Sequence, residues 1–189
     1  MAESSGDLFR GSLLRLAAPA EADVVIITRW SEDADYMRAL DTDFARPRTI
    51  QEIAGQHNPE QPDPNGLLFH LRTLDGDRLI GFVALHSIEW NNRAGQLSIG
   101  IGEADFRGKG YGSEALRLIL RYAFDELNLD RVGLDVISNN ERAIRAYEKV
   151  GFRPEGALRK AVLRDGRRHD RLLMGILREE WLGRSQEAL

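Results

Sequence analysis

Three glycines and two cations gather in one short segment, Phe106-Arg107-Gly108-Lys109-Gly110-Tyr111-Gly112-Ser113. Because glycine has no side chain, it lets the backbone approach a ligand closely and adopt positive φ angles. A helix that begins here would add unpaired N–H groups and the positive end of its dipole. The segment therefore predicts a loop that binds a phosphate or pyrophosphate. The alternative is a glycine-rich turn that binds nothing.

The residues on either side indicate that this loop joins a strand to a helix. Before it, Leu97, Ile99 and Ile101 alternate with small or polar residues, as in a half-buried strand. After it, apolar residues recur at helical spacing and predict a helix over 113–127. The spacing Gly-x-Gly-x-Gly differs from the Walker A loop and from the dinucleotide-binding fingerprint. A nucleotide-dependent phosphotransferase is therefore disfavoured.

The composition is that of a single-domain globular protein, with 189 residues, 42% of them hydrophobic and 30% charged. The net charge of −4 disfavours nucleic acid as the main partner, because a phosphate backbone requires a basic face. The absence of cysteine excludes disulfides, thiolate metal sites and cysteine nucleophiles, and it fits a reducing cytoplasm. No uncharged run approaches the ~18 residues that span a bilayer, and the first residues do not resemble a signal peptide. We therefore expect a cytoplasmic protein without a membrane partner.

Turn and capping signals divide the chain into elements of one domain over 11–181, with a flexible N-terminus (1–10) and a C-terminal tail (182–189). Thr49 and Glu52 match a capping box, and Asp75-Gly76 is a hairpin signal. Before the loop we expect strands over 13–16, 67–74, 79–88 and 96–102, helices over 19–30 and 49–56, and a long loop over 57–66. After it we expect a strand over 132–136, a helix from a capping box at Ser138-x-x-Glu141 to Gly151, and strands over 158–163 and 171–177 around Asp165-Gly166.

Two charged segments are open to more than one interpretation. The first holds the acids Glu32, Asp33, Asp35, Asp41 and Asp43, which form either a solvated face or a cleft wall that attracts a cationic amine. The second holds the cations Arg159, Lys160, Arg164, Arg167, Arg168 and Arg171. These form a solvated strand pair, or they contact an adenosine phosphate or a second subunit, which would make the protein a homodimer.

The order Arg-x-x-Gly-x-Gly at 107–112 resembles the acyl-CoA loop of the GNAT superfamily of N-acetyltransferases. The segment from Asn140 to Phe152 resembles the second signature of that superfamily, Asn-x-x-Ala-x-x-x-Tyr-x-x-x-Gly-Phe. It follows the loop through one helix and one strand, as the family pattern requires. The resemblance covers about residues 11–180. It is closest to the branch of ribosomal-protein N-terminal acetyltransferases and spermidine N-acetyltransferases, as 81–85, 88–94 and 166–174 indicate.

The resemblance implies an α/β (α+β) fold of the GNAT acyl-CoA N-acyltransferase type, a mixed, mostly antiparallel twisted sheet with helices on both faces. It implies transfer of an acetyl group from acetyl-CoA, without a metal, to a primary amine of a protein N-terminus or small molecule. The amine would attack directly in a ternary complex. The alternative function is a catalytically inactive acyl-CoA-binding sensor. In this fold the strand before the loop also splays away from its parallel neighbour.

The same resemblance assigns roles to individual residues. Tyr147 matches the general acid that protonates the leaving thiolate, although a tyrosine on an apolar helix face is otherwise a core aromatic. The residues implied in acetyl-CoA binding are Ile99, Gly100, Ile101, Arg107, Gly108, Lys109, Gly110, Tyr111, Gly112, Ser113 and Asn140.

The general base stays open. Many relatives place a glutamate on the strand before the loop, whereas this strand has Gln96 and Ser98. The candidates are His86, His70, Glu89 and a water chain from the acids at 32–43. Spermidine enzymes carry an acid near the position of Gln96, and its absence here lowers the expectation of a polyamine substrate.

Overall fold

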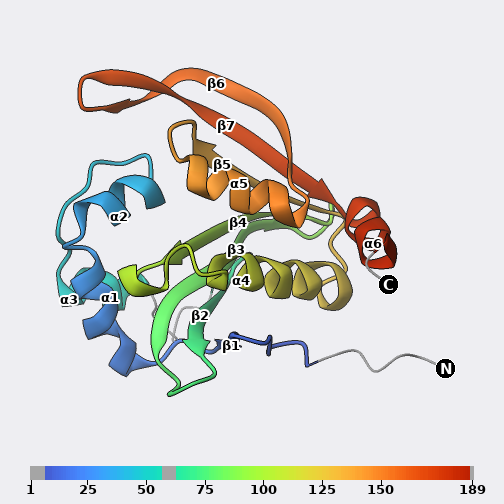
Figure 1. Ribbon diagram of the computed structural model, residues 1–189, viewed down its shortest axis with the longest axis horizontal. Helices are drawn as coiled ribbons and strands as arrows, with labels where there is room; N and C mark the ends of the chain where they lie inside the picture. Colours follow the sequence, from blue (N-terminus) through green and yellow to red (C-terminus); the bar gives the residue numbers. More distant parts are fainter. Residues whose placement is uncertain (1–6, 57–62, 188–189) are drawn as a thin grey trace.

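The structure, a computed structural model, describes residues 7–56 and 63–187 (Figure 1). Within this part seven strands form one sheet in the order β1-β2-β3-β4-β5-β7-β6. All neighbouring strands are antiparallel except β4 and β5, which are parallel. The expected mixed, mostly antiparallel sheet is therefore confirmed. The strands are β1 (Leu14–Ala17), β2 (Leu67–Thr73), β3 (Leu79–Glu89), β4 (Ala94–Ile101), β5 (Arg131–Ile137), β6 (Arg153–Arg164) and β7 (Arg167–Leu177).

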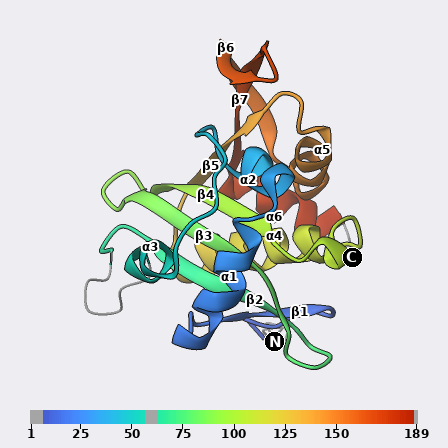
Figure 2. The ribbon, with the colours of Figure 1, turned by 90° about the vertical axis from the view of Figure 1, so that its left-hand side faces the viewer.

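Helices cover both faces of the sheet. Figure 2 shows α3 on one side of the strands and α4 and α5 on the other. None of the helices in the described part of the chain is long and apolar enough to cross a membrane. The helices are α1 (Val24–Trp30), α2 (Ala34–Leu40), α3 (Ile50–Gln56), α4 (Tyr111–Arg121), α5 (Glu141–Val150) and α6 (Arg178–Glu187).

The main core lies between the sheet and α4. Leu116, Ile119 and Leu120 on α4 are buried, and with them Leu97 on β4 and Leu134 on β5. Because side chains alternate across a strand, the residues between these core positions point to the opposite face of the sheet. That face therefore receives polar side chains of β3, β4 and β5.

The sheet opens between β4 and β5. The two strands pair only from Ala94 to Gln96 with Arg131 to Gly133, although both continue for several more residues. From Leu97 onward the β4 edge that faces β5 pairs with no strand among the described residues. The expected divergence of the two strands beside the loop is thus confirmed.

Most local expectations are confirmed. The hairpin at Asp75-Gly76 joins β2 to β3, and the helix predicted over 19–30 forms as a 3₁₀ turn followed by α1. Thr49 and Glu52 exchange the hydrogen bonds of a capping box at the start of α3. Residues 57–62 of the predicted long loop lie outside the described residues.

Three expectations need correction. The capping box at Ser138 is wrong, because Asn140 is the N-cap of α5 and its Oδ1 accepts from the Ala143 N–H at 3.3 Å. Ser138 instead accepts from the backbone N–H of Asp170 at 3.1 Å. The helix after the loop begins two residues early and ends in a π-helical turn, Tyr122–Glu126. The last two strands are longer than 158–163 and 171–177, because they pair with each other along nearly their whole length.

Both ends of the described part of the chain carry structure. The helix α6 includes Arg178–Glu187, which covers most of the segment expected as a tail. Near the other end, the Phe9 ring lies 6.2 Å from Phe69 and 5.8 Å from Tyr122. Residues 1–6 lie outside the described residues.

Candidate functional site

A cavity of about 830 Å³ lies where β4 and β5 diverge. Its walls come from α2, β3, β4, the loop before α4, β5, α5 and β7. Of the residues predicted to act or bind, ten line it: Ile99, Gly100, Ile101, Arg107, Gly108, Gly110, Gly112, Ser113, Asn140 and Tyr147. Two do not. Lys109 is exposed, and the Tyr111 ring packs edge-on against Phe106 at 5.1 Å.

The glycine loop forms an anion-binding cradle at the start of α4. Gly108 and Gly110 have φ angles of 74° and 92°, which other residues rarely adopt, and Gly110 is the N-cap of α4. None of the backbone N–H groups from Gly108 to Ser113 donates to another group in the described part of the chain. A Cβ on Gly108 would meet nothing within 4 Å, and one on Gly112 only Ile101 at 3.9 Å. The loop therefore has both room and free donors for a phosphate group.

The one acid in the first turn of α4 is turned away from this cradle. The Glu114 carboxylate accepts from the backbone N–H groups of Ser12, Leu13 and Leu14 at 2.8–2.9 Å. Burial would raise the pKa of Glu114, but these bonds and one from the Ser12 hydroxyl lower it below its usual value. Its negative charge thus holds the start of β1 and leaves the helix N-terminus to an anion.

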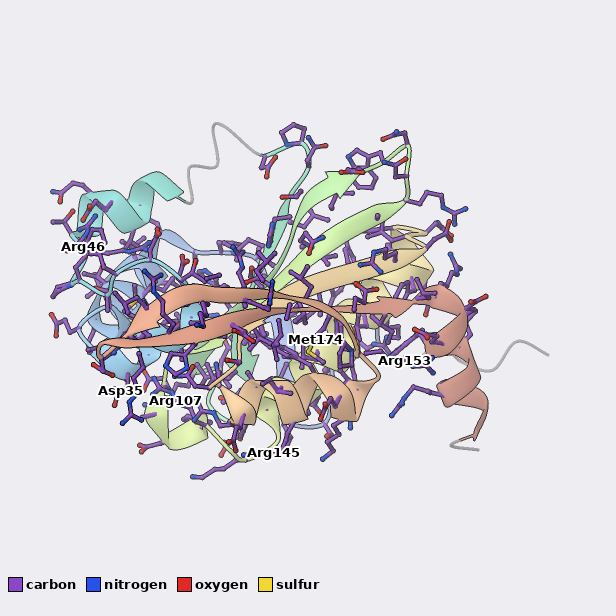
Figure 3. The ribbon with its side chains drawn as sticks, turned by 90° about the horizontal axis from the view of Figure 1, so that it is seen from above. Asp35, Arg46, Arg107, Arg145, Arg153 and Met174 are labelled. Carbon is purple, nitrogen blue, oxygen red and sulfur yellow. The ribbon has the colours of Figure 1, made fainter. Side chains whose placement is uncertain are left out.

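Arg107 holds the loop rather than extending into the cavity as a free cation. Its Nε and Nη2 donate to the carbonyls of Ile101 and Gly102 at 2.8 and 2.7 Å. Its Nη1 lies 2.9 Å from the Asp33 carboxylate. The guanidinium carbon lies 5.2 Å from the centroid of the Tyr36 ring, which is a cation–π contact. Figure 3 shows Arg107 at the same end of the molecule as Asp35 of α2. The side chain therefore ties the loop to the end of β4 and to α2.

The second predicted motif places Asn140 and Tyr147 on the opposite wall. Asn140 caps α5 and its Nδ2 donates to the Ala39 carbonyl at 3.3 Å, which joins α5 to α2. Tyr147 is 9% exposed, packs edge-on against Phe152 and lines the cavity. Burial, and then the Asp135 carboxylate, raise the pKa of Tyr147 to about 12. The hydroxyl is thus protonated at neutral pH, and it donates to no group in the described part of the chain.

Three cations on α5 line the cavity and were not singled out from the sequence: Arg142, Arg145 and Lys149. They occupy variable positions of the second motif. Their spacing i, i+3, i+7 places them on one helix face and is the signal that could have identified them. Figure 3 shows Arg145 on the outer side of α5. Together they make this side of the cavity attractive to an anionic ligand.

The other face of the sheet contributes a polar wall. His86 on β3 lines the cavity, with its Nε2 2.9 Å from Ser98 Oγ on β4. Asp135 on β5 also lines it and binds Arg171 on β7 through two bonds of 2.6 Å. Burial lowers the pKa of His86, whereas Asp135 and Asp63 act in the opposite direction. His86 is therefore neutral at pH 7.

Two other candidate bases lie elsewhere. Glu89 does not line the cavity, and neither does His70, whose Nδ1 lies 2.6 Å from the Asp23 carboxylate in the interior. Burial would raise the pKa of Asp23, but hydrogen bonds from His70 and Arg72 lower it below its usual value. This cluster fixes β2 against the start of α1, which is a structural role.

The acid-rich segment 32–43 forms little of the cavity wall. Glu32 and Asp35 are exposed and do not line it, and Asp33 caps α2 while pairing with Arg107. Of the acids at 32–43 only Asp41 is among the lining residues. The interpretation as a solvated face therefore describes most of the segment.

The basic hairpin reaches across to α2. Figures 1 and 2 show the tip of β6 and β7 extending over α2. Asp165 at the tip pairs with Arg38 of α2 at 2.7 Å. Arg164 donates to the carbonyls of Asp41 and Asp43 at 2.8 and 2.9 Å. The hairpin thus holds the segment that carries Asp41 at the cavity wall.

Comparisons with known proteins agree with this geometry. The model of the GNAT acetyltransferase domain family matches residues 13–153. YdaF of Bacillus subtilis, which is named a ribosomal N-acetyltransferase, is 35% identical over 62% of this chain, but the match spans only 61% of YdaF. Spermidine N(1)-acetyltransferase of Escherichia coli is 33% identical over 80% of this chain and 84% of its own length.

The fold is shared with a solved acetyltransferase. The crystal structure of spermidine N-acetyltransferase from Vibrio cholerae, a complex with CoA and spermine, superposes with a TM-score of 0.82. That match covers 91% of this chain and 99% of the other, at 27% identity. The resemblance seen in the two motifs is confirmed, and the chain belongs to the GNAT family of acetyl-CoA-dependent N-acetyltransferases.

Proposed function

We propose that this chain transfers an acetyl group from acetyl-CoA to a primary amine of a small molecule or a protein N-terminus, by direct attack in a ternary complex. One observation carries the proposal. A single cavity joins the free N–H groups at the start of α4, the unpaired edge of β4 and the hydroxyl of Tyr147. These are the groups that an acyl-CoA thioester and its departing thiolate require.

The residues present fit acetyl-CoA. The N–H groups from Gly108 to Ser113 would hold its pyrophosphate, and the space beside Gly108 and Gly112 leaves room for it. The cations on α5 add positive charge nearby. The backbone at 99–101, which has no β5 partner, would pair with the amides of the pantetheine arm. When bound, acetyl-CoA supplies the acetyl group as an activated thioester.

Tyr147 would supply the proton that the leaving sulfur needs. Its raised pKa keeps the hydroxyl protonated at every pH at which the protein would work. Its exposure to the cavity lets the hydroxyl reach a ligand. A backbone N–H of the β4 edge would polarise the thioester carbonyl.

Direct attack is supported by the composition and by the relatives. The chain contains no cysteine that could carry the acetyl group on a thiol. The Vibrio cholerae enzyme is described in complex with CoA and a polyamine together. In this chain Asp135 is already paired with Arg171, so Asp41 is the one lining carboxylate without an ion-pair partner among the described residues. We therefore assign an amine acceptor without restricting it to polyamines.

An acceptor screen that follows free thiol release from acetyl-CoA tests the proposal. The panel should contain monoamines, diamines, spermidine and peptides with free N-termini. For the best acceptor, initial rates at several concentrations of both substrates should give intersecting lines, as a ternary complex requires. Parallel lines would indicate an acetylated enzyme instead. Tight acetyl-CoA binding without thiol release for any amine would favour the sensor.

A further inference from the structure

His86 and Ser98 form a hydrogen-bonded pair on the polar wall of the cavity. His86 stands opposite Gln96 in the register of β3 and β4, and Ser98 is its diagonal neighbour. The Nε2–Oγ distance of 2.9 Å is that of a hydrogen bond. Both residues line the cavity and are half-buried. Ser98 lies on β4, the strand that borders the gap to β5, and His86 lies one strand further from it.

The surroundings of the pair define its protonation. The Nδ1 of His86 lies 3.2 Å from the Ser87 hydroxyl, to which it can donate, so Nε2 is left to accept from Ser98. The charged groups that act on His86 are Asp135 on β5 and Asp63 before β2. Asp135 is bound to Arg171, and Asp63 accepts from the Asn65 N–H. Burial outweighs both acids and keeps the imidazole neutral at pH 7.

The other titratable groups of the cavity are less suited to receive a proton. Asp135 is held by two bonds from Arg171. The Asp41 carboxylate accepts from the backbone N–H groups of Thr42 and Asp43. Tyr147 is protonated. Among the described residues His86 is the only histidine that lines the cavity.

We propose that Ser98 and His86 form a proton relay that deprotonates the amine acceptor. This inference rests on the proposed function, because it names the base of that reaction. Both side chains line the cavity, so a hydroxyl–imidazole pair that spans β3 and β4 is in place to receive the proton.

The relay moves one proton. An ammonium N–H proton passes to Ser98 Oγ while the Ser98 hydroxyl proton passes to His86 Nε2. The nitrogen lone pair is freed for attack, the Ser98 hydroxyl is restored, and His86 becomes an imidazolium. The imidazolium then returns its proton to solvent. No oxidant, metal or further reactant takes part.

The test compares His86→Gln and Ser98→Ala with the wild-type protein. Glutamine can still bond to Ser98 but does not titrate near neutral pH. We expect kcat/KM for the amine to fall at least tenfold at pH 7 in both variants, with acetyl-CoA affinity unchanged in calorimetry. His169→Gln is the matched control, because His169 does not line the cavity.

The pH profile separates this role from a structural one. In wild type, kcat/KM should fall on the acidic side as His86 protonates, at the pKa that NMR titration of the His86 ring gives in the free protein. His86→Gln should lose that limb and recover toward wild type above pH ~10, where the amine deprotonates unaided. Ser98→Ala should shift the His86 ring titration.

The outcomes are distinguishable. Wild-type kcat/KM in His86→Gln across the pH range, or an acidic limb that disagrees with the ring titration, would overturn the relay and leave the acetyltransferase assignment intact. A uniform loss at all pH values would assign His86 a structural role and also reject the relay. A wild-type protein that acetylates no amine would overturn the proposed function itself.

Discussion

Replacing Tyr147 by phenylalanine tests whether its hydroxyl donates a proton in the reaction or whether the ring only packs in the core. The ring is buried against Phe152 and would keep its packing. The hydroxyl has no hydrogen-bond partner in the described part of the chain. Its removal should therefore change the free energy of unfolding by well under the ~1 kcal/mol that a lost hydrogen bond costs. Acetyl-CoA affinity should also stay close to wild type.

Turnover should respond very differently. A positioned general acid contributes ~10²–10⁴ in rate, which corresponds to about 3–5 kcal/mol of the activation barrier. The assay is thiol release at saturating acetyl-CoA and amine, together with urea unfolding and calorimetry on the same preparation. Because the pKa of Tyr147 is raised to about 12, wild-type activity should show no basic limb due to this residue below pH ~11.

Tyr122→Phe is the matched control. Tyr122 is a partly buried tyrosine that packs against Phe9 and Phe69 away from the cavity. It should keep full turnover. Near-wild-type turnover in Tyr147→Phe, with or without a loss of stability, would refute the reasoning. A loss of turnover that merely follows a loss of folded protein would also count against it.

Three further changes test other parts of the structure. Gly112→Asp places a negative charge beside the free N–H groups, at a site whose φ angle suits any residue. The affinity for acetyl-CoA, measured by calorimetry, should fall more than tenfold. The control Gly55→Asp, at an exposed glycine, should keep the wild-type affinity for acetyl-CoA. Arg164→Ala removes the hydrogen bonds from the hairpin to the Asp41 segment, so KM for the amine should rise while the affinity for acetyl-CoA stays at its wild-type value. An equal rise in KM in Arg167→Ala, at an exposed arginine of the same hairpin, would contradict this role of Arg164. Asp23→Asn should lower the free energy of unfolding by about 3 kcal/mol at pH 7, because it breaks a buried ion pair. Since the folded pKa of Asp23 is lowered, this stability is lost as pH falls below the usual value of 3.8, and denaturation curves of wild type and variant should converge there.

Local patterns determined much of the fold. The alternation before the glycine loop, the hairpin at Asp75-Gly76 and the stop at Gly151 depend on neighbours within a few residues, and the structure confirms them. The Ser138 capping box failed because Asn140 offered a competing cap two residues later. Serine and asparagine are both favoured N-cap residues, so the local sequence does not decide whether the helix begins after Ser138 or after Asn140.

The sequence by itself determined the family, the glycine loop and the position of Tyr147. These features follow from two motifs, at 107–112 and 140–152, whose residues shape one turn and one helix from neighbours close in the chain. Only the tertiary structure decided which side chains meet across strands. It placed Arg107 in an internal ion pair with Asp33, removed Glu32 and Asp35 from the cavity, and brought His86 to Ser98. The physical reason is that burial, charge pairing and strand register join residues far apart in the chain, and no local spacing encodes them.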